Sequence, residues 1–177
     1  MASQDIAAAL ERVESILRNQ PEAGRGDDAP ATARWQGGLR VQTAHANGTA
    51  VVTDMPPQFG GTGDQVSPGW LVRAGAASCI ASRIAMSAAS EGIELTELEV
   101  VARSLSDARG IFGMSDAAGA PICAGPLNVR LHVRIAARGT APEQLQSLVE
   151  RCHSCSPVSA ALTDPIPVEL HIDARSI

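Results

Sequence analysis

The sequence predicts an α+β protein, in which helices and antiparallel strands mix without regular alternation. Three observations predict this class. Residues 68–92 form a long helical stretch, residues 127–137 alternate between apolar and polar side chains, and the pair Asn47-Gly48 marks a hairpin turn. With 177 residues the chain has the size of one domain and can bury a substantial core.

The N-terminal part is expected to be a helix followed by a linker. Apolar residues recur at helical spacing over residues 3–19, and Ser3 could cap this helix. Residues 21–30 contain Pro, Gly and Asp, which favour irregular structure. We therefore divide the chain into an N-terminal helix and linker, residues 1–30, and a single domain, residues 31–177.

The domain is expected to begin with a hairpin and to continue into its principal helix. Extended segments at residues 34–44 and 49–54 flank the Asn-Gly turn. Residues 55–67, with two Pro and three Gly, form a loop long enough to suspect a role at a site. Pro68 suits the first turn of the following helix and Gly92 its end. Because this helix is almost free of charge, we expect it to be buried on most sides.

The second half of the domain is expected to contain three strands and two helices. A half-buried strand, a loop and the clearest strand of the chain precede an amphipathic helix, a short helix and a closing strand. The half-buried strand is expected over residues 97–106, the loop over 107–125 and the clearest strand over 127–137. The amphipathic helix follows over residues 142–153, the short helix over 157–162 and the closing strand over 166–172.

Composition excludes several classes of function. The formal net charge is −5, all 14 basic residues are Arg, and they form no basic run, so we expect neither nucleic acid nor a membrane surface as a partner. The absence of Lys excludes Schiff-base chemistry on this chain. No apolar run has the length of a membrane span and no signal pattern opens the chain, so we expect a cytoplasmic protein. In that compartment, four cysteines indicate free, reactive or metal-binding thiols.

Cys79 lies in the middle of the principal helix. A free cysteine there is often a small apolar filler of the core. For a reactive cysteine, the thiolate must be stabilised. Arg83, four residues further on the same helix face, is the candidate for that role.

Cys155 lies directly before Ser156-Pro157, where a short helix is expected to begin. Free amide groups and the positive end of the helix dipole favour the thiolate at such a position. Cys152 and Cys155 also form a Cys-x-x-Cys pair. A local dithiol at this pair, or a metal site completed by Cys79 or Cys123, therefore stays open as an alternative.

Three motifs in this order resemble the OsmC/Ohr family, the osmotically induced and organic hydroperoxide resistance proteins. They are the long helix with Ala-Ala-Ser-Cys79-Ile-Ala, the motif that runs from Cys155 through Ser-Pro-Val-Ser, and the tail Thr163-Asp-Pro-Ile-Pro-Val. The resemblance covers about residues 34–174. It implies an OsmC-like fold in an intertwined homodimer, with long central helices wrapped by antiparallel sheets.

The resemblance also implies an activity. By this resemblance we expect a thiol-dependent peroxidase that reduces organic hydroperoxides, with Cys79 as the attacking thiol and Cys155 as the resolving thiol. A dithiol reductant, lipoyl-linked in relatives, would restore both thiols. Neither a metal nor a bound organic cofactor is implied.

The sequence departs from the family pattern at the residues that activate the thiol. Family peroxidases carry a Glu ten residues before the first Cys, paired with an Arg, whereas here that position is Gly69. Arg40 or His45 could take the place of the Arg, and Trp70 could line a pocket. The alternative function is therefore a non-catalytic OsmC-like protein that binds a small molecule.

Overall fold

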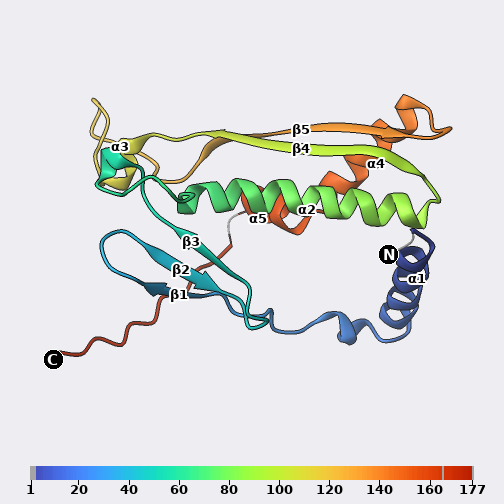
Figure 1. The fold of residues 1–177 in the computed structure, drawn as a ribbon, viewed down its shortest axis with the longest axis horizontal. Helices are drawn as coiled ribbons and strands as arrows, with labels where there is room; N and C mark the ends of the chain where they lie inside the picture. Colours follow the sequence, from blue (N-terminus) through green and yellow to red (C-terminus); the bar gives the residue numbers. More distant parts are fainter. Residues whose placement is uncertain (1–2, 165, 177) are drawn as a thin grey trace.

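A computed structural model of the chain describes residues 3–164 and 166–176. It confirms the α+β class: a long central helix lies against a two-stranded antiparallel sheet, and a separate three-stranded sheet precedes both (Figure 1). The elements are α1 (Ser3–Asn19), η1 (Pro21–Gly24), β1 (Thr32–Trp35), β2 (Val41–Ala44), β3 (Ala50–Thr53), η2 (Pro57–Phe59), α2 (Pro68–Ser90), β4 (Leu95–Leu105), α3 (Ala108–Ile111), β5 (Leu127–Ala137), α4 (Pro142–Ser154) and α5 (Pro157–Thr163).

The first sheet has one strand more than the sequence predicts. The segment expected as one extended stretch over residues 34–44 is broken into β1 and β2 at Gly37-Gly38. Both glycines have positive φ, 101° and 56°, so they reverse the chain and let β1 and β2 pair antiparallel. The Asn47-Gly48 turn then joins β2 to β3 as expected.

The core lies where α2 meets the β4–β5 sheet and α4. Ile80, Ile84 and Ala88 on one face of α2 are buried against Leu148 and Cys152 of α4. Apolar side chains of β4 and β5 cover this cluster. The apolar residues of β5 alternate with polar ones because every second side chain of this strand packs against the core cluster on α2 and α4.

The helix α2 is less enclosed than expected. Its residues Ala76, Ile80, Ile84 and Ala88 are buried on one face, but Val72 and Met86 are exposed. The prediction that α2 is buried on most sides is therefore wrong for the single chain. The three-stranded sheet is also open, because none of its strands packs extensively against another helix or strand of the described chain.

The closing strand expected over residues 166–172 is not a strand. In the described part of this segment the backbone has no strand partner, and Figure 1 shows the C-terminal tail running away from the rest of the chain. Its alternating side chains Ile166, Val168, Leu170 and Ile172 are 63% to 89% exposed. An extended segment needs a neighbouring strand to satisfy its backbone, and none of the strands that the structure describes pairs with this one.

Two long loops meet at the N-terminal end of α2. The rings of Phe59 and Phe112 stack at a centroid distance of 5.9 Å, which joins the loop before α2 to the loop between β4 and β5. The latter loop contains the single-turn helix α3, which the sequence does not predict; the Asp107 side chain caps it by accepting a hydrogen bond from Arg109 N.

Candidate active site

Cys79 is half-buried on α2 and faces the start of α5. The Ser156 hydroxyl lies 3.3 Å from the Cys79 sulfur, in hydrogen-bond contact as its donor. Ser156 itself is fully buried. Two segments that are 77 residues apart in the sequence therefore meet at this sulfur atom.

The position of Ser156 follows from the local sequence. It is the N-cap of α5, and its Oγ accepts a hydrogen bond from Ser159 N at 3.5 Å. Pro157 occupies the first turn, where its missing N–H costs nothing. Sequence reasoning missed Ser156 as a site residue, although a serine directly before a proline at a helix start is a capping signal that could have found it.

The thiols of Cys152 and Cys155 have different surroundings. Cys152 is 1% exposed, and its sulfur lies 3.6 Å from the carbonyl oxygen of Arg83 on α2. Cys155 is exposed at the end of α4, with its sulfur 3.8 Å from Ser154 Oγ. Both thiols are free, as are Cys79 and Cys123. The pairing of Cys79 with Cys155 stays a prediction, because the side chain that contacts Cys79 is that of the next residue, Ser156.

Within the part of the chain that the structure describes, three of the four supporting residues, Arg83, Trp70 and His45, make no contact with the Cys79 sulfur that would support a role there. The Arg83 side chain makes no hydrogen bond or ion pair with any described residue, Trp70 is 46% exposed, and His45 at the hairpin turn accepts a hydrogen bond from Asn47 N. None of them has a hydrogen bond to the sulfur within the described ranges. Their proposed roles stay untested.

Arg40 belongs to a polar cluster with Asp54, Thr62 and Asp64. Its guanidinium donates to Asp64 Oδ1 at 2.5 Å and to Thr62 Oγ1 at 2.9 Å, and lies 3.6 Å from Asp54 Oδ2. The Thr62 hydroxyl also lies 2.6 Å from Asp54 Oδ2 and within hydrogen-bond reach of Asp64. This cluster holds the loop before α2 together. It also engages the Arg40 guanidinium, which the sequence suggests as a partner for the thiolate.

The same cluster stabilises two carboxylates. The hydrogen bond from Thr62, followed by that from Arg40, lowers the pKa of Asp64 to about 2. The pKa of Asp54 is also lowered, chiefly by hydrogen bonds from the Thr62 side chain and backbone. In both cases the charged form is favoured in the folded chain.

The fold should therefore lose stability in acid through this cluster. Because both pKa values are lowered, the stabilisation is fully present above the ordinary value of 3.8 and is lost as the pH falls towards about 2. The urea concentration at the unfolding midpoint should therefore fall between pH 5 and pH 2, and we call this fall the acid limb. We expect the acid limb to be shallower in Thr62→Val than in wild type. Arg138→Gln, which removes only an exposed ion pair with Glu94, is the control and should keep the wild-type limb. Parallel acid limbs for Thr62→Val and wild type would contradict the assignment.

The described residues contain no group of three or more His, Cys, Asp or Glu side chains arranged to hold a metal ion. Among the helices that the structure describes, none is long and apolar enough to cross a lipid bilayer.

Comparison with known proteins identifies the family. The sequence model of the OsmC-like protein family matches residues 61–171, which include α2, Cys79 and the junction between α4 and α5. The chain belongs to the OsmC-like protein family. No curated protein matches it significantly.

Solved structures show that this OsmC-like chain has the family fold. An OsmC-like protein from Mycoplasma pneumoniae matches with a TM-score of 0.64 at 13% identity, covering 80% of this chain and 91% of that one. An organic hydroperoxide resistance protein OsmC from Legionella pneumophila matches with 0.56 at 21%, covering 78% and 90%. One from Elizabethkingia anophelis matches with 0.57 at 22%, covering 80% and 92%. At these identities the likeness establishes the fold alone.

Proposed function

We propose that this OsmC-like protein is a thiol-dependent peroxidase that reduces organic hydroperoxides, with Cys79 attacking and Cys155 resolving. The observation that carries the proposal is the 3.3 Å contact between Ser156 Oγ and Cys79 Sγ. It brings the α4–α5 junction, where Cys155 lies, against the sulfur on α2. Structurally similar proteins named for organic hydroperoxide resistance support the same activity.

The chemistry needs only thiols. The Cys79 thiolate attacks the hydroperoxide, so that an S–O bond forms, the O–O bond breaks and an alcohol leaves after protonation. The resulting sulfenic acid is attacked by the Cys155 thiolate, which releases water and forms a disulfide. A dithiol reductant then returns both cysteines to thiols and itself becomes a disulfide.

Ser156 has a positioning role in this scheme. Its hydroxyl donates to the sulfur of Cys79 and is held by Ser159 N from the other side. Resolution then requires the junction to rearrange, so that the Cys155 sulfur takes the place of the Ser156 hydroxyl. Cys155 is exposed and its neighbouring helix α5 has only seven residues, which favours such a local movement.

The activity is tested by hydroperoxide consumption with cumene hydroperoxide and dihydrolipoamide. We expect Cys79→Ser to lower turnover by about 10³-fold, because no other thiol lies at the same place on α2. Cys155→Ser should keep one turnover per chain and lose repeated turnover. Cys123→Ser, which removes an exposed thiol in the loop between β4 and β5, is the matched control and should stay at the wild-type rate. An active Cys79→Ser variant would refute the mechanism.

Disulfide mapping after mild peroxide treatment separates this scheme from a local dithiol. A link between Cys79 and Cys155 supports it. A link between Cys152 and Cys155 favours the local pair, although burial of Cys152 under the Arg83 carbonyl opposes that outcome.

A second candidate is a binding protein of the same fold without turnover. Two observations favour it: Gly69 stands where family peroxidases have Glu, and Arg40 is held by Asp64 and Asp54. Turnover by wild-type protein that depends on Cys79 would exclude this candidate.

We further propose that the protein is an intertwined homodimer. The exposed Val72 and Met86 on α2, the three-stranded sheet without a packing partner and the exposed apolar tail are surfaces that a second copy could cover.

Sedimentation equilibrium tests the dimer. We expect a mass about twice the 18.3 kDa of one chain. Met86→Glu should weaken association at least about tenfold, because it buries a charge where two central helices would pack. Ala23→Glu, which adds the same charge to the exposed η1 segment, should not. A monomeric wild-type protein at high micromolar concentration would overturn the proposal.

A further inference from the structure

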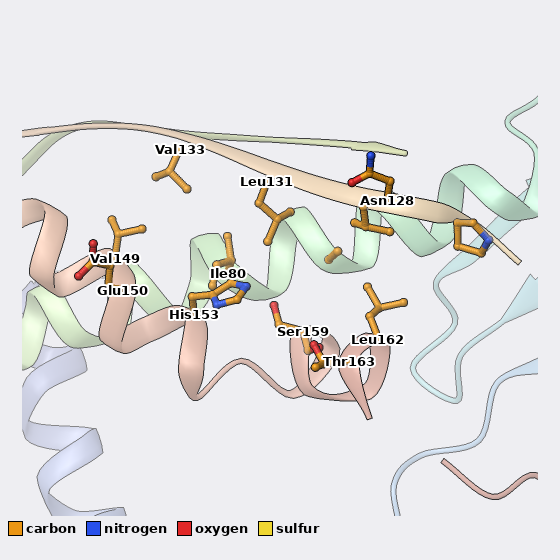
Figure 2. A pocket seen from close by; sticks show the side chains of 13 residues that line it. Ile80, Asn128, Leu131, Val133, Val149, Glu150, His153, Ser159, Leu162 and Thr163 are labelled. Carbon is orange, nitrogen blue, oxygen red and sulfur yellow. The ribbon is translucent and has the colours of Figure 1, made fainter. Parts of the chain in front are cut away.

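A second feature of the fold lies beside the thiol and is not used by its chemistry. A cavity of about 570 Å³ opens between α2, β5, α4 and α5 (Figure 2). This volume is within the range of small-molecule sites, about 300–1,000 Å³. Cys79 is not among the residues that line it, although its neighbours on α2, Ala76 and Ile80, are.

The cavity has an aliphatic side and a polar side. Leu131 and Val133 of β5 and Ile80 of α2 form the aliphatic side, whereas Ser159 and Thr163 of α5 lie opposite them (Figure 2). Among the described residues, the lining contains no Phe, Tyr or Trp side chain, and its one aromatic ring is the small His153 imidazole. Such a surface fits an aliphatic chain better than a flat ring.

The Ser159 hydroxyl is the unusual group in this cavity. Ser159 is 7% exposed, and its Oγ has no hydrogen-bond partner among the described residues. Figure 2 shows its side chain directed into the space between α5 and β5. The neighbouring Thr163 hydroxyl, in contrast, donates to the carbonyl oxygen of Ser159. A buried hydroxyl without a partner is costly, and a ligand in this cavity would be in position to supply the missing partner.

Charge limits the head group of that ligand. Glu150 is the only lining residue with a formal charge, and the His153 ring projects into the same space (Figure 2). A carboxylate ligand would bring a second negative charge into a cavity whose lining already includes the Glu150 carboxylate, and like charges repel each other. An uncharged oxygen avoids this cost and can still accept a hydrogen bond from Ser159.

We propose that this cavity binds a small aliphatic molecule with an uncharged terminal oxygen, such as a primary alcohol, and that the Ser159 hydroxyl donates to that oxygen. The site adjoins the thiol through one turn of α5, since Ser159 N donates to Ser156 Oγ and that oxygen contacts Cys79. An alcohol is also the product that hydroperoxide reduction releases. Binding itself does not depend on whether Cys79 turns over.

The test is calorimetric titration of the full-length Cys79→Ser variant with 1-octanol and, separately, with octanoate at pH 7. The Cys79→Ser background removes the thiol chemistry, so that failure of this proposal and failure of the peroxidase proposal are separate results. We expect 1-octanol to bind once per chain and octanoate to bind about tenfold more weakly. Introducing Glu150→Gln into the Cys79→Ser variant should reduce the difference in affinity between 1-octanol and octanoate.

Two further substitutions locate the ligand. Ser159→Ala should weaken 1-octanol binding about fivefold, the usual worth of one hydrogen bond. It should not lower the melting temperature of the free protein, because it removes a hydroxyl that has no partner. Ser147→Ala is the matched control, since its hydroxyl bonds within α4 to the carbonyl oxygen of Glu143 and does not line the cavity. Leu162→Trp should weaken binding at least tenfold by filling the space.

Several results would overturn the proposal. One is the absence of 1-octanol binding, which is also the result expected if a second protomer fills the cavity. Another is equal affinity in Ser159→Ala and Ser147→Ala when both variants are folded. A third is octanoate binding as tight as that of 1-octanol.

Discussion

In the Ser156→Cys variant, the introduced cysteine should form a disulfide with Cys79 almost completely under mild oxidation. The Ser156 Oγ already lies 3.3 Å from the Cys79 sulfur, and a disulfide requires two side chains that face each other at this kind of separation. The variant has five cysteines, so we expect two of them to disappear from a thiol titration and three to remain. Peptide mass spectrometry would identify the new link.

This variant also tests which residue of the α4–α5 junction is in register with the thiol. The control is Ser147→Cys on an exposed part of α4. Both variants are compared in a Cys155→Ser background, so that the Cys79–Cys155 link cannot form. There Ser147→Cys should keep all four titratable thiols, whereas Ser156→Cys should keep two. In a Cys155→Ser background, Ser156→Cys should restore repeated turnover with a dithiol reductant. Failure of the introduced sulfur to react with Cys79 would mean that the contact between α5 and α2 is not maintained in solution.

Gly61→Ala should destabilise the protein by about 3 kcal/mol, because it forces the backbone of the loop before α2 to move. A Cβ at Gly61 would lie 1.8 Å from the carbonyl oxygen of Met55 and 2.8 Å from Asp54 Oδ1. The Met55 oxygen belongs to the backbone, and the Asp54 carboxylate is buried and held by hydrogen bonds, so neither atom can simply swing aside. The chain must therefore shift, and the hydrogen bonds that hold the Arg40 cluster should weaken with it.

Urea unfolding measures this effect. Gly26→Ala is the matched control, because a Cβ there meets nothing within 4 Å, and its stability should stay within about 0.5 kcal/mol of wild type. The acid limb described above should also become shallower in Gly61→Ala. A Gly61→Ala variant as stable as Gly26→Ala would show that the loop is not packed as described.

Local patterns were sufficient to predict most of the elements. The Asn47-Gly48 turn, the Pro68 start of α2 and the alternation of β5 each depend on residues close together in the sequence, and all three are confirmed. Gly37-Gly38 was missed as a turn because the flanking segments continue the same extended pattern. The tail at residues 166–172 has the alternation of a strand, but a strand also needs a partner, and pattern alone does not supply one.

The site was predictable in part, for a similar reason. The sequence singled out Cys79 and the motif around Cys155, and the structure brings that motif to Cys79. It could not tell which residue of the motif faces the sulfur, because a shift of one residue at a helix junction leaves the motif unchanged. The engagement of Arg40 with Asp54 and Asp64 depends on contacts 14 and 24 residues apart, which composition and periodicity do not encode.

The four cysteines differ in solvent access, so their rates of chemical labelling can report local unfolding of the chain. Cys123 and Cys155 are exposed, Cys79 is half-buried and Cys152 is 1% exposed beneath α2. An alkylating reagent should label them in that order, and labelling of Cys152 must wait until α4 separates from α2. The labelling rate of Cys152, the slowest of the four, therefore measures how often α4 separates from α2, without any added probe.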